Sequence, residues 1–340
     1  MIKVFANANY DFLSKRKIAI LLTALFVIPG FIWILFGGLN YSIEFTGGTI
    51  VQVRANSDTI DVGDVRTALS AGALSSAEIN EFGARNEFVI RARLGETGDT
   101  TEAGAQRVAL EVTRSLESAF GPGSFTLQRR EAVGPKVGSE LRQRAMLAIL
   151  LSFIVTLVYL AFRFEWRFGV AAIIATLHDI MATIAFMRYL NLEVSLVLVS
   201  AILTVIGYSL NDTIVVFDRV RENLHKYKRD DFAGVLNRSL NETLPRTVLT
   251  GGATLLALLS LLLLAGEVLR PFSWVMLFGI VTGTFSSVYI ASPVLLYIER
   301  RWPGKEARGV KARVMAAGET MTPPPPPAGT RPSGKRVPTA

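Results

Sequence analysis

The sequence predicts a polytopic α-helical membrane protein with six transmembrane helices and one inserted α+β domain. Half of the 340 residues are apolar and only 19% are charged, which gives a mean hydropathy of +0.39. Six apolar runs approach the roughly 20 residues that a helix needs to cross a hydrocarbon core of about 30 Å. A long polar stretch, residues 39–140, separates the first run from the second. This pattern excludes an ordinary soluble enzyme.

The six spans follow from the length and position of the apolar runs. They are predicted at residues 18–38, 141–163, 168–188, 194–217, 246–266 and 271–298. The first run is longer than the roughly 7 to 15 apolar residues of a signal peptide, and no small-residue cleavage site closes it. We therefore expect the first span to be a retained anchor.

Basic residues flank alternate ends of the spans. They lie in residues 1–17, in the connection 163–167 between the second and third spans, and throughout residues 218–245. By the positive-inside rule these ends are cytoplasmic. The other two short connections carry one basic residue between them, Arg270, and so face outward. We therefore expect 218–245 to be a cytoplasmic loop and 39–140 to be an extracytoplasmic domain.

The net charge of +8 is unevenly distributed. Residues 39–140 hold 10 Lys/Arg against 14 Asp/Glu, a net of −4, so the rest of the chain carries +12. This sorting indicates membrane topology and contact with anionic lipid or a cytoplasmic partner rather than with nucleic acid.

The inserted domain alternates between strand-like and helix-like patterns. Strands are predicted at 48–54, 77–82, 87–93 and 124–131, and helices at 62–71 and 101–120. The order βαββαβ is that of a ferredoxin-like fold. Gly47 and Gly48 predict a turn just before the first strand. Because the strands carry no His/Asp/Ser set, we expect a binding or lever domain rather than a catalytic one.

The C-terminal residues 299–340 form a basic, proline-rich tail. Five consecutive prolines occupy 323–327, and no apolar periodicity follows them. We expect this tail to be disordered and cytoplasmic.

Several chemistries are excluded by composition. The chain has no cysteine and only two histidines, which removes thiolate metal sites, disulfides and histidine-rich metal centres. It also lacks a GxxxxGK[ST] loop for nucleotide phosphates. We therefore predict no catalytic residues, no metal and no cofactor.

Two carboxylates lie within the predicted spans. Asp212 belongs to the fourth span and Asp179 to the middle of the third. A carboxylate at such a position costs about 3 kcal/mol even on the lenient insertion scale, so each is a candidate functional residue. At about 100° per residue, Thr204, Tyr208 and Asn211 fall on the same side of the fourth span as Asp212. This polar side must face protein or water.

Arg246 opens the fifth span at the depth expected for Asp212, and we predict an ion pair between them. Desolvation favours the neutral form of Asp212 and the neighbouring arginine favours the ionised form, so the group could load and release a proton. The alternative is a permanent salt bridge that only holds helices in register. Asp179 has the same two interpretations.

Small residues within the spans predict close helix packing. The positions concerned are Gly207, Gly251, Gly252, Gly279 and Gly283.

Four stretches of the chain together resemble the SecF family of the SecD/SecF protein-export complex. They are VIGYSLNDTIVVFDRVREN at 205–223, FEWRFGVAAIIATLHDIMAT at 164–183, LPRTVLTGGATLL at 244–256 and IEFTGGT at 43–49. The resemblance extends over essentially the whole chain apart from the tail. One departure is Glu44, which stands where the family usually has Asp before its Gly-Gly turn.

The resemblance implies one half of a resistance-nodulation-division fold, for which SecD supplies the matching half. It implies a non-enzymatic subunit of the bacterial Sec translocase that uses the proton motive force to promote preprotein movement through SecYEG. The family's proton-pathway residues fall on Asp212 and Arg246. Such a protein lies in the bacterial inner membrane, in contact with lipid, with both termini cytoplasmic.

Two other functions remain open from the residues alone. A resistance-nodulation-division exporter of lipids or small molecules would need a second six-helix half and an outer substrate cleft. An intramembrane aspartyl protease would pair Asp179 with Asp212 as acid and base. The chain lacks the GxGD motif of such proteases.

Overall fold

The fold is described from a computed structural model of the chain. It describes residues 5, 8–57, 59–70, 74, 77–82, 84–93, 102–228, 230–266 and 269–304. Most of the predicted tail, residues 305–340, lies outside the described residues, as do parts of the N-terminal segment 1–17.

Six helices among the described residues are long and apolar enough to cross a membrane. They include α1 (Arg16–Gly37), α6 (Pro135–Arg163), α7 (Trp166–Tyr189), α8 (Leu196–Lys226) and α9 (Phe232–Leu264). The sixth consists of α10 (Arg270–Ser286), the π-helical turn η2 (Ser287–Ala291) and α11 (Ser292–Arg301). The predicted number of membrane helices is thus confirmed.

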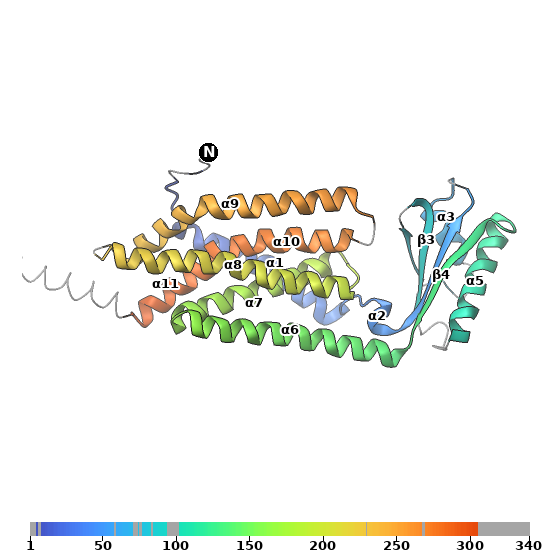
Figure 1. The fold of residues 1–340 in the computed structure, drawn as a ribbon, viewed down its shortest axis with the longest axis horizontal. Helices are drawn as coiled ribbons and strands as arrows, with labels where there is room; N and C mark the ends of the chain where they lie inside the picture. Colours follow the sequence, from blue (N-terminus) through green and yellow to red (C-terminus); the bar gives the residue numbers. More distant parts are fainter. Residues whose placement is uncertain are drawn as a thin grey trace, which may run out of the picture.

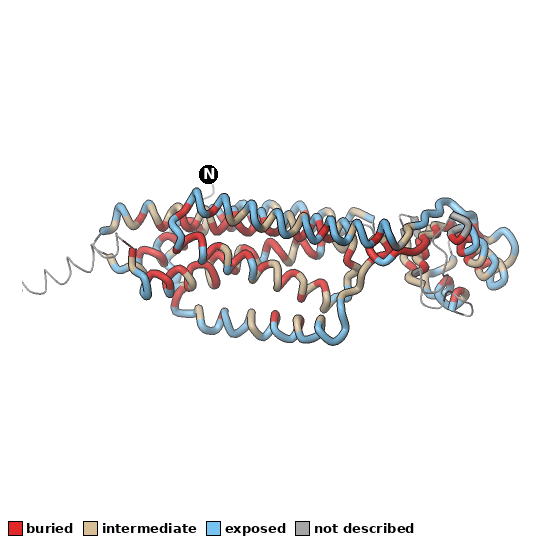
Figure 2. The backbone as a smooth tube through the Cα atoms, turned by 90° about the horizontal axis from the view of Figure 1, so that it is seen from below, coloured by how far each residue is buried: buried red, intermediate tan, exposed pale blue. Residues whose placement is uncertain are grey.

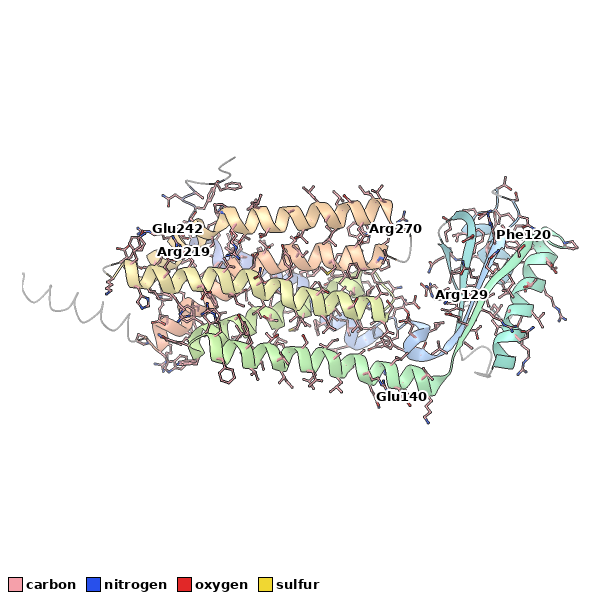
Figure 3. All side chains as sticks on the ribbon, viewed as in Figure 1. Phe120, Arg129, Glu140, Arg219, Glu242 and Arg270 are labelled. Atoms are coloured by element: carbon pink, nitrogen blue, oxygen red, sulfur yellow. The ribbon has the colours of Figure 1, made fainter. Side chains whose placement is uncertain are left out.

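The six helices form one elongated bundle with a small β-sheet domain at one end (Figure 1). The α8–α9 connection, the end of α11 and the start of α1 lie at the end of the bundle away from the sheet (Figure 1). Arg219 and Glu242 mark that far end, and Arg270 lies at the end facing the sheet (Figure 3). The segments with predicted cytoplasmic charge therefore share one end of the molecule.

The bundle has an inner and an outer set of helices. The apolar windows of α7, α8 and α10–α11 are 50%, 56% and 56% buried, whereas those of α1, α6 and α9 are 17%, 11% and 17% buried. The buried residues accordingly lie mainly along the inner helices and in the interior of the sheet domain (Figure 2). The apolar outer sides of α1 and α6 suit a lipid environment.

Close packing of α8 against α10 depends on two glycines. A Cβ atom at Gly279 would lie 2.3 Å from Cγ2 of Val205, and one at Gly283 would lie 2.7 Å from Cβ of Ser209. Since such distances are far below van der Waals contact, the two backbones approach closely only without side chains there. Gly251 is buried on α9, and its Cβ position is 3.8 Å from Oγ1 of Thr284.

Two of the glycines predicted to pack helices have no close neighbour opposite them among the described residues. At Gly207 and Gly252 an added Cβ would meet nothing within 4 Å. Gly207 lies on the exposed side of α8. The sequence shows that a residue is small but does not show whether a second helix lies opposite it.

The predicted loop 218–245 is largely helical, because α8 continues to Lys226 and α9 begins at Phe232. Polar contacts stabilise these extensions against each other. Nε of Arg219 lies 2.6 Å from Glu242 Oε2, and the Asn223 amide donates to Ser239 Oγ at 3.0 Å. The apolar runs mark the spans, but the helical hydrogen-bond ladder continues past them into polar sequence.

The sheet domain contains four antiparallel strands in the spatial order β2-β3-β1-β4. Along the chain its elements are β1 (Gly48–Ala55), α3 (Val62–Ser70), β2 (Glu78–Phe82), β3 (Ala84–Arg93), α5 (Glu102–Phe120) and β4 (Phe125–Val133). Its core is filled by alternate residues of the strands and by the inner sides of the two helices, including Val51, Phe88, Ile90, Val112 and Leu116.

Two boundaries of this domain differ from the prediction. Strand β3 begins at Ala84, which pairs with Phe82 of β2, so the strand extends into residues expected in a turn up to 86. Helix α6 begins at Pro135, inside the predicted outer domain, because proline suits the first turn of a helix.

The segment before β1 joins the sheet domain to the bundle. Short helix α2 (Ile43–Thr46) ends at Gly47, which has φ 81°. Gly48 has φ 157°, and a Cβ there would lie 2.5 Å from the carbonyl oxygen of Ala92. Oε2 of Glu44 accepts from the Leu196 N–H at 2.7 Å and so holds the first turn of α8. The double glycine and the acid before it thus form the connection between the two parts.

Replacing Gly279 by Val should destabilise the protein, because its side chain would overlap Val205. Overpacking of this kind costs about 1 to 3 kcal/mol. Thermal unfolding of the detergent-solubilised protein, followed by tryptophan fluorescence, measures the effect. The matched control is Gly207→Ala, which meets no neighbour and should leave the unfolding temperature unchanged or slightly raised. Equal unfolding temperatures for Gly279→Val and the parent chain would contradict the packing described.

Candidate functional site

Asp212 is buried between three helices, with only 5% of the residue exposed. Its Oδ2 accepts from Thr284 Oγ1 of α10 at 3.1 Å, and its Oδ1 accepts from Thr247 Oγ1 of α9 at 3.4 Å. Both donors are neutral hydroxyls. A hydroxyl can donate to a carboxylate and can equally accept from a carboxylic acid, so this site can accommodate either form of Asp212.

Arg246 does not form the predicted ion pair with Asp212. Among the described residues, no guanidinium nitrogen of Arg246 lies within 4 Å of a carboxyl oxygen of Asp212. Arg246 is instead exposed on α9. The reason is helical geometry, since Thr247 points to Asp212 and the preceding residue lies about 100° around the helix. Arg246 nevertheless interacts electrostatically with Asp212. The arginine is therefore near the carboxyl group but unpaired with it.

The polar residues predicted on the Asp212 side of α8, together with two threonines of α9, line the outside of the bundle. Thr204 and Asn211 are exposed on α8, and Thr250 and Thr254 are exposed or half-buried on α9. The Tyr208 hydroxyl donates to Thr254 Oγ1 at 3.2 Å and bridges the two helices. A polar strip at this depth of a membrane protein requires a protein or water neighbour. We name these residues, together with Arg246, the α8–α9 polar strip.

Asp179 is more deeply buried, with 1% of the residue exposed. Its Oδ2 accepts from Ser286 Oγ at 2.7 Å and also from Ser209 Oγ. Its Oδ1 lies 3.0 Å from Nδ1 of His178. This carboxyl group is thus enclosed by α7, α8 and α10.

The two carboxyl groups are held by neighbouring turns of the same two helices. On α8, Ser209 contacts Asp179 one turn before Asp212 itself. On α10, Thr284 contacts Asp212 and Ser286, two residues later, contacts Asp179. The close approach of these helices at Gly283 brings both sites to adjacent positions. A displacement of α8 against α10 must therefore change the surroundings of both acids.

The hydroxyl donors were not predicted from the sequence. Thr247, Thr284, Ser209 and Ser286 all lie in apolar spans, where a hydroxyl is a weak signal by itself because it can bond to its own helix. Thr250 shows this alternative, since its Oγ1 donates to the Arg246 carbonyl at 2.9 Å. Only the packing of the helices distinguishes the two uses.

The sixth span changes its helical period beside these sites. The π-helical turn η2 follows α10, and Ser292 Oγ donates to the Ser287 carbonyl at 2.9 Å. The Ser287 hydroxyl lies 2.9 Å from Thr213 Oγ1 on α8. Single π-helical turns inside helices are common at functional sites.

Two protein-family models match the chain, one over the C-terminal region and one around the Gly-Gly turn. Residues 112–301 match the family described as protein export membrane protein SecD/SecF, C-terminal, which covers more than half of the chain. Residues 32–59 match the SecD/SecF GG motif. The chain belongs to the SecD/SecF family. The GG motif includes Gly47 and Gly48, at the connection between sheet and bundle.

Relatives resemble the chain over most of its length. The protein translocase subunit SecF of Gemmatimonas aurantiaca is 50% identical over 95% of this chain and 96% of its own. The subunit of the same name from Rickettsia rickettsii is 36% identical over 87% of this chain and 94% of its own.

Solved structures of longer SecDF chains have the same fold. The crystal structure of SecDF from Thermus thermophilus, a translocon-associated membrane protein, matches with a TM-score of 0.74 and 35% identity over 86% of this chain. A SecDF structure in a super-membrane-facing form matches with a TM-score of 0.64 and 34% identity over 94% of this chain. The chain spans 39% and 41% of those two chains.

Replacing Ser286 by Ala should destabilise the bundle, because a fully buried carboxyl group loses one of its donors. The loss of a hydrogen bond to such a group costs about 1.5 to 3 kcal/mol. The matched control is Ser200→Ala on α8, whose exposed hydroxyl bonds only to the Val197 carbonyl of its own helix. Thermal unfolding in detergent should separate the two variants, and equal unfolding temperatures would contradict the hydrogen bond to Asp179.

Proposed function

We propose that the chain is the SecF subunit of a bacterial Sec protein translocase and that protonation and deprotonation of Asp212 drive its conformational change. The observation that carries the proposal is the setting of Asp212. It is a buried carboxyl group, bonded only to hydroxyls and located beside the exposed α8–α9 polar strip. A group so placed can exchange a proton with a path along that strip.

The α8–α9 polar strip also supports a partner in the membrane. Its exposed hydroxyl, amide and guanidinium groups are unsuited to lipid. The similar SecDF chains are more than twice as long as this one. We propose that a SecD subunit with six further helices covers the strip, which would complete a resistance-nodulation-division fold and enclose Arg246 next to Asp212.

The proposal needs no nucleotide, metal or other cofactor as an energy source, and no enzymatic step. One elementary charge that moves through 100 mV releases about 2.3 kcal/mol. This energy is sufficient to shift a two-state equilibrium by more than tenfold. The proton gradient across the bacterial inner membrane would supply it.

The sheet domain would convert this change into work on the preprotein. It is attached to the bundle through α2, α6 and the bond from Leu196 to Glu44, so a movement of α8 reaches it directly. We propose that it is a ferredoxin-like domain on the extracytoplasmic side, near the exit of the SecYEG channel. Both chain termini and the α8–α9 connection would then be cytoplasmic, with their basic residues against anionic lipid.

The two alternative functions receive less support. An aspartyl protease needs carboxyl groups that share a proton, whereas Asp179 and Asp212 bond to separate sets of hydroxyls and not to each other. A resistance-nodulation-division exporter would share the proton site, and the family match to protein export proteins argues against it.

Asp212→Asn should abolish the gradient-dependent part of preprotein translocation into inverted membrane vesicles, because an amide cannot exchange the proton. The rate with an imposed proton gradient should fall to the rate without one. The matched control is Asp218→Asn on the same helix, where the carboxylate is exposed and paired with Arg163 at 2.6 Å. Unchanged gradient stimulation in Asp212→Asn would refute the proposal.

Arg246→Met should impair the same step while the protein still inserts into the membrane, because Arg246 contributes charge beside Asp212 without holding the fold. Immunoblotting of the vesicles measures the amount inserted, and the translocation assay measures the gradient response. If both variants disappear from the membrane, Asp212 and Arg246 would be structural residues only.

A further inference from the structure

The beginning of the described chain is held by two side chains that lie far away in sequence. Residues 8–11 have no helix or strand of their own. Oδ1 of Asn241 accepts from the Tyr10 N–H at 2.7 Å, and Nδ2 of Asn241 donates to the Tyr10 carbonyl at 2.9 Å. One amide side chain thus satisfies both backbone groups of one residue, as a neighbouring strand would.

A second asparagine also forms hydrogen bonds to the backbone of this segment. Oδ1 of Asn237 accepts from the Phe12 N–H at 3.0 Å, and its Nδ2 donates to the Tyr10 carbonyl at 2.9 Å. Asn237 and Asn241 are four residues apart on α9 and therefore lie on one side of the helix. Every one of these four bonds goes to the backbone, so the contact does not depend on which side chains occupy positions 10 and 12.

The same segment also contacts the sixth span and the core. The Phe12 ring packs edge-on against the ring of Tyr289 in η2, with centroids 6.3 Å apart. Leu13 is buried in a cluster that contains Leu236 and Leu240 of α9. A short 3-10 helix, Leu13–Lys15, leads from there into α1 at Arg16. Residues 10–13 therefore tie α9, the π-helical turn and α1 together at one end of the bundle.

Helix α9 is fixed unevenly on the two sides of Pro245. Six of its buried residues precede Pro245 and three follow it. The earlier part is also tied to α8 by the Arg219–Glu242 pair. Pro245 has no N–H to donate to the Asn241 carbonyl, so the helical ladder is interrupted at the boundary. Helices bend most readily at such points.

The part of α9 after Pro245 carries two residues that lie next to Asp212. Thr247 donates to Asp212, and Arg246 adds a positive charge nearby. A bend at Pro245 would move both residues relative to Asp212 while leaving the earlier part in place. Such a movement needs a fixed base, which the contacts of residues 10–13 provide.

We propose that residues 10–13 form a strap, positioned by Asn237 and Asn241, that fixes α9 before Pro245 and confines its movement to the part carrying Arg246 and Thr247. Asn237 and Asn241 are positioning residues in this account. The inference rests on the proposed function, because it describes how the proton site is rearranged.

Attachment of the strap can be measured without any transport assay. The chain has no cysteine, so Asn9→Cys gives a unique site for a nitroxide label beside the strap. In Asn237→Ala/Asn241→Ala the ratio of attached to released strap should fall about tenfold or more, equivalent to about 1.4 kcal/mol. The label should become mobile in this double variant. In the control Lys226→Ala, a substitution of an exposed residue at the end of α8, the label should stay immobile. An equally immobile label in the double variant would refute the attachment.

The role of the strap in translocation is tested by attaching it to α9 through a covalent bond. In the full complex in inverted vesicles, Tyr10→Cys/Asn241→Cys lacks one amide, so its gradient-dependent translocation should be several-fold slower when reduced. Joining the cysteines, either as a disulfide formed with an added oxidant or through a short bifunctional maleimide, should restore the parental rate, because the part of α9 before Pro245 need not move. Loss of activity on cross-linking, or a parental rate in the reduced form, would overturn the proposal.

Pro245→Ala gives an independent test, because it restores the missing hydrogen bond and stiffens the proposed bend. The gradient-dependent rate should fall several-fold while the label at position 9 stays immobile. A parental rate in this variant would also overturn the proposal. Failure of the proposed function itself has a different signature, namely unchanged gradient stimulation in Asp212→Asn whatever the state of the strap.

Discussion

The close contact between α8 and α10 is the constraint on which the rest of the structure depends. Two glycines of α10 allow Val205 and Ser209 to approach its backbone. That approach encloses Asp179 and Asp212 away from water and surrounds them with hydroxyl groups. A buried carboxylate is costly unless its oxygens are bonded or the group is protonated. The packing of small residues thus creates the condition under which, in the proposed function, a proton on Asp212 would change the preferred helix arrangement.

The sites differ in how they connect to the surroundings. Asp179 is enclosed within the chain, and its bonds to Ser209 and Ser286 hold α7 to α8 and α10. Asp212 lies next to the exposed polar strip of α8 and α9, which must face protein or water rather than lipid. We therefore propose a division of roles, in which Asp179 holds the helices together and Asp212 exchanges the proton. In the proposed cycle, the end of α9 near Arg246 moves, and the start of α9 stays fixed by the N-terminal strap.

The sequence is sufficient to predict the six spans, the inserted domain and both buried acids, because each follows from hydropathy or local periodicity. Gly279 and Gly283, which the sequence predicts to pack helices, lie opposite Val205 and Ser209 of α8. The sequence does not predict on which side of α9 the Arg246 side chain lies, since a shift of one residue along a helix rotates the side chain by about 100°. The strap left no signal either, because the bonds of Asn241 to Tyr10 join residues 231 positions apart and create no repeating pattern.

Infrared difference spectroscopy of the complete complex in sealed vesicles tests the central claim most directly. Imposing a proton gradient should change the carbonyl band of a protonated carboxyl group. This change should be lost in Asp212→Asn and retained in Asp218→Asn. A spectrum that does not respond to the gradient, or a response that persists in Asp212→Asn, would contradict proton exchange at Asp212.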